Sequence, residues 1–384
     1  MHSDALPPTA YDIGGQRWLK DAPGFAEAIA HAFDQRMRPR CLCQKSPDGQ
    51  GVEMYVARLM DGYIVKRMPT TGSLHATSCP SYEPPADHTG LGQLLGNAII
   101  EDPITGKTAL KLDFPMTKLP RSSTIPVAAS RKGSVSSQGQ KLTLRALLHY
   151  LWDQAELTHW HPGFVGKRSW TTVRKHLLRA AENKVTHGQP LLGNIYIPEA
   201  FSVAQREEIN ARRLRQWARA KTPLDGPQEL MLMVAEVKEI VPARYGYKAV
   251  VKHVPDQAFA LDEALYRQLC RHFEQELALW WMEDELHLLM IATFRLDGVG
   301  VPRLACLSLM LSTPQWIPVE DEAERQLIST LVKTGRKFIK GLSFGFRSET
   351  PSVCATLVDL GATPMPVFAE YPPPLPIPPA LQTA

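Results

Sequence analysis

Cys41-Leu42-Cys43 and, further along the chain, His75-Ala76-Thr77-Ser78-Cys79 are two short runs that each carry a pair of residues able to bind a metal. A structural zinc site takes four nitrogen or sulfur ligands in a tetrahedron, usually donated as two short pairs. We therefore predict one zinc site with the ligands Cys41, Cys43, His75 and Cys79. Because four ligands leave no coordination position open, the zinc is expected to be structural.

The segment between the two pairs predicts how they meet. Residues 52–59 are strand-forming, Asp61-Gly62 is a strong signal for a two-residue turn, and residues 63–68 are typical of a returning strand. The two ends of a hairpin lie side by side, so the pairs would meet as in a zinc ribbon. The alternative is two unrelated thiols with a surface histidine, and His88 is a spare candidate that we expect to be a loop histidine.

The composition indicates a globular protein in a reducing compartment. A length of 384 residues with 44% hydrophobic residues is enough for two or three domains with real cores. Six cysteines are too few for a disulfide scaffold. The sequence has no apolar leader segment and no run near the ~20 apolar residues of a spanning helix, so we expect a cytoplasmic protein without membrane contact.

A helical region follows a segment rich in Ser, Pro and Gly at 115–140. Residues 142–152 form a strongly apolar helix pattern, and residues 169–181 form a second helix with Ser169 as its N-cap. Residues 189–197 read as an extended segment. Helix, turn, helix and strand is the order of a winged helix-turn-helix, which binds DNA through its second helix.

The positive charge of the chain is concentrated in the same region. Residues 141–221 contain 14 Lys and Arg against 6 Asp and Glu, a net charge of +8, whereas the whole chain has +4. Clustered cations are typical of proteins that bind a polyanion. The residues predicted to contact nucleic acid are Lys167, Arg168, Arg174, Lys175, Arg179, Arg212, Arg213 and Arg215. The alternative is a solvated helix surface.

The remaining third of the chain predicts two strands, a helix, two strands, a helix and two strands. The strands fall at 229–241, 245–254, 286–296, 304–311, 352–359 and 365–369, and the helices at 261–281 and 319–339. This order predicts an α+β domain, an α/β sandwich with a mostly antiparallel sheet.

Five segments are therefore expected. They are a zinc-ribbon-like β-rich domain at 1–114, a flexible linker at 115–140, a basic winged-helix-like domain at 141–224, an α+β domain at 225–370 and a proline-rich tail at 371–384.

One group of residues indicates a catalytic alternative. Asp225, Glu236 and Lys238 resemble the D…E-x-K pattern of restriction-endonuclease-like folds, in which carboxylates hold Mg²⁺. Glu236 and Lys238 would share one face of a strand, since side chains alternate. Such a pair is also common on a solvated strand face. The chain has neither a Walker phosphate loop nor an H-E-x-x-H motif. Whether it is an enzyme stays open.

Several stretches also resemble a known bacterial family. With the cysteines at 41, 43 and 79, they are Val234-Ala235-Glu236-Val237-Lys238-Glu239-Ile240, Gln315-Trp316-Ile317-Pro318-Val319 and Phe338-Ile339-Lys340-Gly341-Leu342. They are similar to the family of domain of unknown function 1173 (DUF1173) over about residues 25–370. The resemblance implies a gene on a plasmid or integrative conjugative element but no known activity. The three cysteines carry over from it, whereas His75 is inferred from its spacing.

From these observations we expect a zinc-stabilised, DNA-associated, non-catalytic protein of a mobile or conjugative element. The alternatives are a Mg²⁺-dependent nuclease and an assembly factor that binds other proteins of a transfer system.

Overall fold

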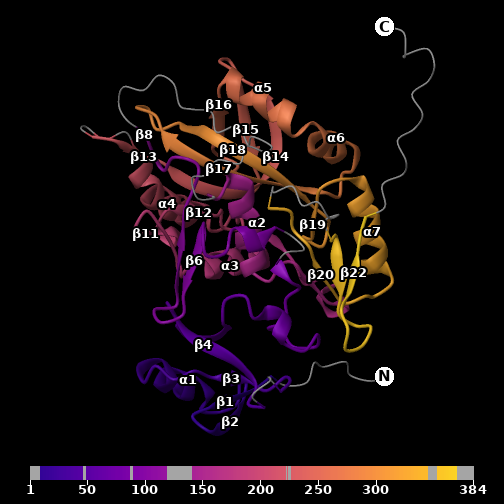
Figure 1. The fold of residues 1–384 in the computed structure, drawn as a ribbon. Helices are drawn as coiled ribbons and strands as arrows, with labels where there is room; N and C mark the ends of the chain where they lie inside the picture. Colours follow the sequence, from indigo (N-terminus) through magenta and orange to yellow (C-terminus); the bar gives the residue numbers. More distant parts are fainter. Residues whose placement is uncertain are drawn as a thin grey trace, which may run out of the picture.

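The computed structural model describes residues 9–45, 49–86, 90–118, 141–221, 223, 226–344 and 353–369. Asp225, His88, residues 119–140 of the predicted linker and the tail from residue 370 lie outside these ranges. The N-terminal strands lie at one end of the molecule, helices α2 and α3 lie in the middle, and the long strands β14–β18 lie at the other end (Figure 1). The chain is of the α+β class, as predicted.

An antiparallel sheet of order β2-β1-β3-β4-β5 forms the N-terminal unit. Its elements are β1 (Ala10–Ile13), β2 (Gln16–Leu19), α1 (Phe25–Asp34), β3 (Arg40–Cys41), β4 (Val52–Leu59) and β5 (Gly62–Arg67). The predicted hairpin is confirmed, with Leu59 opposite Gly62 and Met54 opposite Arg67. Helix α1 packs its apolar side, with Phe25 and Ile29, into the small core of this unit.

The central region combines a small sheet with two helices. The sheet order is β11-β10-β7-β6 and β7 runs parallel to β10. The elements are β6 (Ile99–Asp102), β7 (Lys107–Leu110), α2 (Leu144–Gln154), α3 (Trp170–Ala181), β10 (Lys184–Thr186), β11 (Gln189–Pro190) and β12 (Ile195–Tyr196). Helix α2 is buried on almost every side, whereas α3 buries one side only. Ser169 caps α3 as predicted, because its side chain accepts from the Thr172 amide.

The long strands do not form one layer of a sandwich but close on themselves. Strand β14 (Met231–Pro242) pairs with β15 (Tyr247–Val251) on one side and, along its first half, with β17 (His287–Leu296). β15 pairs with β16 (Ala258–Leu261), which meets β18 (Pro302–Ser312) in parallel, and β18 pairs with β17. We call these five strands the barrel. The sequence predicted the strands but not the closure, because it depends on pairings between segments far apart in the chain.

Aromatic side chains fill the inside of the barrel. Trp217, at the end of α4 (Arg206–Trp217), contacts Phe259 and Phe294 with tilted rings whose centroids lie 5.6 and 5.1 Å away. All three side chains are buried, as are Val237 and Ala249 on the neighbouring strands. Burial of such large apolar groups is the main stabilising term of the fold, worth about 1.5–3 kcal/mol for each fully buried side chain.

Two predicted helices differ from the sequence pattern, one by a break and the other by an earlier end. The helix expected at 261–281 breaks at Phe273 into α5 (Glu263–His272) and α6 (Glu274–Met282). The helix expected at 319–339 is α7 (Glu322–Lys333), which Gly335 ends with a positive φ of 70° while the Arg336 amide bonds back to Leu331. Gly is the preferred residue there, since it adopts positive φ without strain. Residues 338–340 are therefore a strand rather than helix.

The remaining strands join distant parts of the chain. They are β8 (Thr117–Lys118), β9 (His159–Trp160), β13 (Gln228–Glu229), β19 (Pro318–Val319), β20 (Phe338–Lys340), β21 (Ala355–Leu357) and β22 (Met365–Val367). β9 pairs with β20, so the central region contributes a strand to the C-terminal sheet β22-β21-β20-β9. One apolar cluster likewise contains Leu147 of α2, Leu177 of α3 and Leu289 of the barrel.

Removing the cap of the buried helix α2 gives a test of this description. The Thr143 hydroxyl accepts a hydrogen bond of 3.1 Å from the Ala146 amide. We expect Thr143→Ala to lower the free energy of unfolding by about 1 kcal/mol, measured by chemical denaturation. Thr143→Ser keeps the hydroxyl and serves as the control. Equal stability of the two variants would contradict the cap.

Candidate functional site

The four predicted metal ligands come together at the end of β3, the central strand of the N-terminal sheet. One ligand atom from each of Cys41, Cys43, His75 and Cys79 lies within 4.8 Å of every other. The Cys41 and Cys79 sulfurs are 3.7 Å apart, and the His75 Nδ1 atom is 3.5 Å from the Cys43 sulfur and 3.7 Å from the Cys79 sulfur. Ligands about 2.0–2.3 Å from one tetrahedral ion would be separated by about 3.5–3.8 Å. The cluster therefore has the size of a metal site.

The hairpin places the two pairs as the sequence predicted. Cys41 ends β3, and His75 directly follows a short 3₁₀ turn, Gly72–Leu74, reached from the returning strand β5. Gly51 has a φ of 91°, and a Cβ atom there would come within 2.7 Å of the Cys41 carbonyl. Only glycine allows the start of β4 to pass so close to the first ligand pair.

Three of the four side chains are buried and Cys43 is half-buried, and all three cysteines are free thiols. Contacts with the thiols of Cys41 and Cys79 lower the pKa of Cys43, whereas the contact with Cys43 raises the pKa of Cys41. A metal binds the thiolate form, so Cys43 is the thiol best prepared to give up its proton. The buried Nε2 atom of His75 has no hydrogen-bond partner in the described chain. Three thiols and one imidazole match the donor set of tetrahedral sulfur–nitrogen metal sites.

Four of the eight predicted nucleic-acid contacts are held by other protein groups. Arg168 donates to the carbonyls of Leu157 and His159, and Arg174 donates to the Ile197 carbonyl over 3.0 Å. Arg212 makes two hydrogen bonds of 2.9 Å to Glu199. Arg213 is buried and pairs with Asp256. These four arginines are engaged within the protein, and the sequence did not show it for Arg213, because its partner Asp256 lies 43 residues further along the chain.

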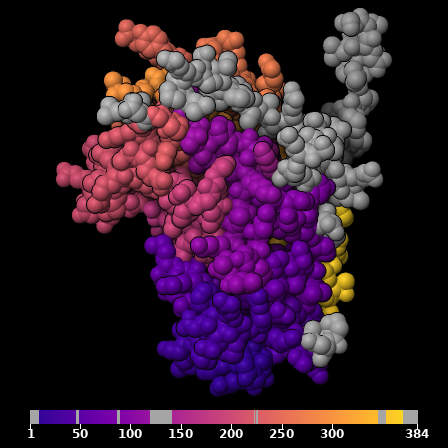
Figure 2. Space-filling model, turned by 60° about the vertical axis from the view of Figure 1, so that its left-hand side comes forward, coloured from indigo at the N-terminus to yellow at the C-terminus, as the bar shows by residue number. Residues whose placement is uncertain are grey.

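The other four cations are exposed. Lys175 and Arg179 lie one turn apart on the open side of α3, Lys167 precedes the helix, and Arg215 lies on α4. None of the four makes an ion pair with a described residue. In the space-filling view the indigo N-terminal unit forms the lower end of the molecule, and the pink residues of the α4 region lie on the flank of the part above it (Figure 2). Positive charge is thus available on α3 and beside it.

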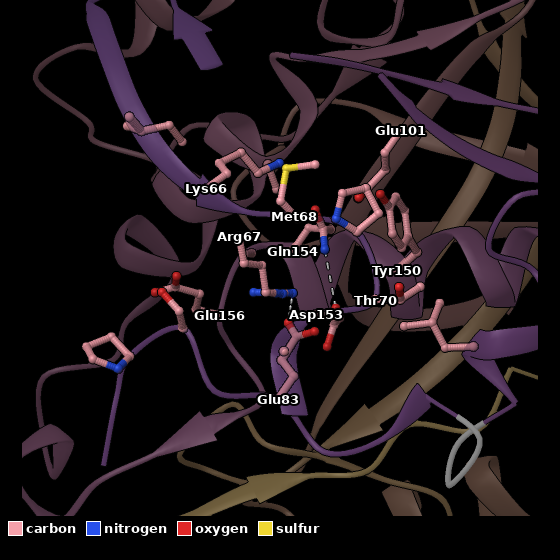
Figure 3. A pocket seen from close by; sticks show the side chains of 18 of the residues that line it. Lys66, Arg67, Met68, Thr70, Glu83, Glu101, Tyr150, Asp153, Gln154 and Glu156 are labelled. Atoms are coloured by element: carbon pink, nitrogen blue, oxygen red, sulfur yellow. Dashed lines mark hydrogen bonds and ion pairs between the residues drawn. The ribbon is translucent and has the colours of Figure 1, made fainter. Parts of the chain in front are cut away.

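A large cleft that the sequence did not indicate opens between the N-terminal unit and the central region. Its volume is about 1200 Å³, and its walls come from β5, β6, α2, α3 and β20. Figure 3 shows several of the charged side chains on its walls. The lining includes Lys66, Glu101, Tyr150, Asp153 and Lys184.

The cleft holds ionisable groups without an ion-pair partner among the described residues. Lys184 is buried, and within the described ranges its amine bonds only to the neutral Gln154 and Thr108 side chains, at 3.2 and 3.4 Å. Burial lowers the pKa of Lys184 well below its ordinary value of 10.5 and raises the pKa of Asp153. The buried hydroxyl of Tyr150 has no partner in the described chain. Such walls can bind a ligand that carries both an anionic group and hydrogen-bond donors.

The pattern that suggested a nuclease is not assembled in the described chain. Asp225 lies outside it. Glu236 is buried, and it accepts hydrogen bonds of 2.6 Å from both Lys252 and His287. Lys238 is exposed, and the pairing of β14 is irregular between Val237 and Glu239, so Glu236 and Lys238 do not share one face. The contacts with Lys252 and His287 give Glu236 a structural role.

A second catalytic pattern, missed in the sequence, is also explained by structure. Gly341-Leu342-Ser343-Phe344-Gly345 matches the G-x-S-x-G pattern of serine hydrolases. His149 contacts the Ser343 carbonyl over 2.6 Å and makes no bond to its hydroxyl. A Cβ atom on Gly341 would lie 2.0 Å from the Val353 carbonyl, so close packing of two chain segments requires this glycine.

Comparisons with known proteins identify a family but no activity. A family model described as "Protein of unknown function (DUF1173)" matches residues 11–371. No curated protein and no solved structure matches the chain. None of the helices in the described ranges has the length and apolar character needed to span a membrane.

The Glu236 ion pairs predict a pH-dependent contribution to stability. Burial alone would raise the pKa of Glu236, but the bonds from His287 and Lys252 outweigh it and lower the pKa from its ordinary value of 4.5. The stabilisation is therefore complete above pH 4.5 and is lost as the pH falls through the lower folded-state pKa.

We expect Glu236→Gln to lower the free energy of unfolding by about 1–3 kcal/mol at pH 7, with a smaller difference from wild type below pH 4.5. Urea unfolding at several pH values measures it. The exposed Glu239→Gln on the same strand is the matched control and should change the free energy by less than about 0.5 kcal/mol. A pH-independent difference would contradict the ionised pair.

Proposed function

The chain belongs to the DUF1173 family of proteins of unknown function, and we propose from its own residues that it is a zinc-stabilised protein that associates with DNA without catalysis. The exposed cations of α3 carry this proposal. Lys175 and Arg179, with Lys167 before the helix, point away from the core and lack ion-pair partners among the described residues. Unpaired cations on one helix surface attract phosphate groups.

The order of elements around α3 supports the same function. Helices α2 and α3 are followed by the hairpin β10–β11, which turns at His187 and Gly188 with positive φ. This is the order of a winged helix, in which the second helix enters the major groove and the hairpin contacts the backbone. Phosphate contacts would dominate binding, because no residue of α3 stands out as a base reader.

We also infer that the metal of the Cys41, Cys43, His75 and Cys79 cluster is zinc, held by the ends of a hairpin as in a zinc ribbon. Zinc prefers four thiolate and imidazole ligands in a tetrahedron. The ligand set leaves no position for a substrate, so the metal would stabilise the unit and take no part in chemistry. The core of this unit is small, so metal binding would supply much of its folding free energy.

The zinc proposal is tested by metal analysis. Purified protein should carry about one zinc per chain, and Cys43→Ser should lose it and melt at a lower temperature. Cys270→Ser removes a thiol outside the cluster and should keep the zinc. A wild-type protein that is fully folded and free of metal would refute the proposal.

The DNA proposal is tested by fluorescence anisotropy with a labelled duplex across a salt series in EDTA. Affinity should fall steeply with salt. The double variant Lys167→Ala/Lys175→Ala should bind more weakly. It should also reduce the slope of log affinity against log salt concentration by about 0.9 for each phosphate that is no longer neutralised. Arg271→Ala/Lys333→Ala removes the same charge from exposed positions on α5 and α7 and is the control.

Two outcomes would count against the DNA proposal. No binding at low salt would leave the assembly factor as the better account. Equal weakening in both double variants would show a general charge effect rather than a surface on α3.

A further inference from the structure

The barrel has a strand order that bears on ligand binding. In chain order the first to fifth strands of the barrel are β14, β15, β16, β17 and β18. Around the barrel the order is β14-β15-β16-β18-β17, and β17 pairs with β14 to close it. The third and fifth strands are parallel, and helices α5 and α6 lie between the third and fourth. This is the arrangement of OB-fold barrels, which bind oligonucleotides on the second and third strands and in the loops after the first and fourth.

A strand order alone does not assign a function, so the surface must supply the chemistry. One side of the barrel is covered, because Leu232, Leu289 and Met310 pack into the same apolar cluster as α2. The loop after the first strand, 243–246, and the loop after the fourth, 297–301, lie near each other, because the strand residues beside them pair across the barrel. Tyr247 pairs with Leu261, and the next residue, Ala260, pairs with Arg303, which lies opposite Arg295.

Cations follow the outer surface of the barrel beside these two loops. Arg295 lies opposite Arg303, Arg303 is paired in register with Ala260, and Ala260 lies opposite Lys248. Their neighbours Phe294, Leu304 and Ala249 point into the barrel and are buried, so all three cations point outward. Like charges placed directly opposite are unfavourable. Asp297 pairs with Arg303 at 2.9 Å and offsets only part of this charge.

An aromatic ring lies in the first of these loops. Tyr245 is 81% exposed, and the Arg244 guanidinium lies 5.3 Å from its ring centre. A rigid exposed ring beside an arginine is the device on which unpaired bases stack in single-strand-binding proteins. The residues between the cations on the second and third strands, Val250, Ala258 and Ala260, are small and partly exposed, which leaves room for a strand.

We propose that the rim formed by Arg244, Tyr245, Lys248, Arg295 and Arg303 binds single-stranded DNA, with a base stacked on Tyr245 and phosphates on the cations. That the polyanion is DNA rests on the proposed function. The surface is separate from α3, and it adds a preference for unpaired strands, because a base inside a duplex cannot stack on Tyr245.

The test is anisotropy with a labelled oligo(dT) of about 15 nucleotides and, in parallel, the labelled duplex, both in EDTA. Tyr245→Ala should weaken oligo(dT) binding about tenfold or more and leave duplex binding within twofold. Tyr245→Phe keeps the ring and should bind like wild type. Lys248→Ala should lower the salt slope for oligo(dT) by about 0.7.

A matched control is Trp281→Ala, which removes another exposed aromatic side chain, 68% exposed, at the far end of β17 from loop 297–301. It should leave oligo(dT) affinity unchanged. Circular dichroism of each variant confirms that the barrel is folded.

The outcomes separate the two proposals. In one outcome, duplex binding depends on Lys167 and Lys175, whereas oligo(dT) binding is unchanged in the Tyr245 and Lys248 variants. This outcome would refute the proposal for the rim and support the one for α3. Oligo(dT) binding that depends on Tyr245 without duplex binding would keep the rim and overturn the α3 surface. No binding of either DNA would overturn both.

Discussion

The two-sided pairing of β14 is the constraint on which most of the structure depends. Along its first half this strand bonds to β17 and to the short β12, and along its second half it bonds to β15. The backbone donors and acceptors of a buried strand must be hydrogen-bonded. The first half of β14 meets this requirement only when it pairs with β17. Closure in turn creates the interior that Trp217, Phe259 and Phe294 fill. The outer side of the same strands supplies Leu232 and Leu289 to the core beneath α2.

The N-terminal unit is held in a different way. Its core is small, and four polar side chains, Cys41, Cys43, His75 and Cys79, occupy a place where a larger domain would put apolar residues. A metal bound there would hold the two ends of one hairpin together. The cleft lies between this unit and the central region, with walls from both, so the position of the hairpin also sets the shape of the cleft.

Local sequence patterns predicted most helices and strands, but they did not predict contacts between residues far apart in the chain. The hairpin turn at Asp61-Gly62, the Ser169 cap and the ligand pairs each depend on residues a few positions apart, and the structure contains all three. Arg168 and Arg213 bond to other groups of the protein, which the sequence did not show for Arg213 because its partner Asp256 lies 43 residues further along the chain. Their contact with nucleic acid stays a prediction. Gly335 was a local signal for the end of α7 that was overlooked. The charge in the cleft left no mark in the sequence, since Lys184 resembles any other lysine until its burial is known.

The order of the barrel strands also bears on protein synthesis. A ribosome releases β14 and β15 well before β17, so the first strand leaves the exit tunnel with an apolar edge that has no neighbour until about residue 294 has followed. During that interval the chain exposes a long strand rich in Met and Val. Open edges of this kind pair readily with other chains. Slow translation over residues 243–286 would therefore prolong the exposure of this strand.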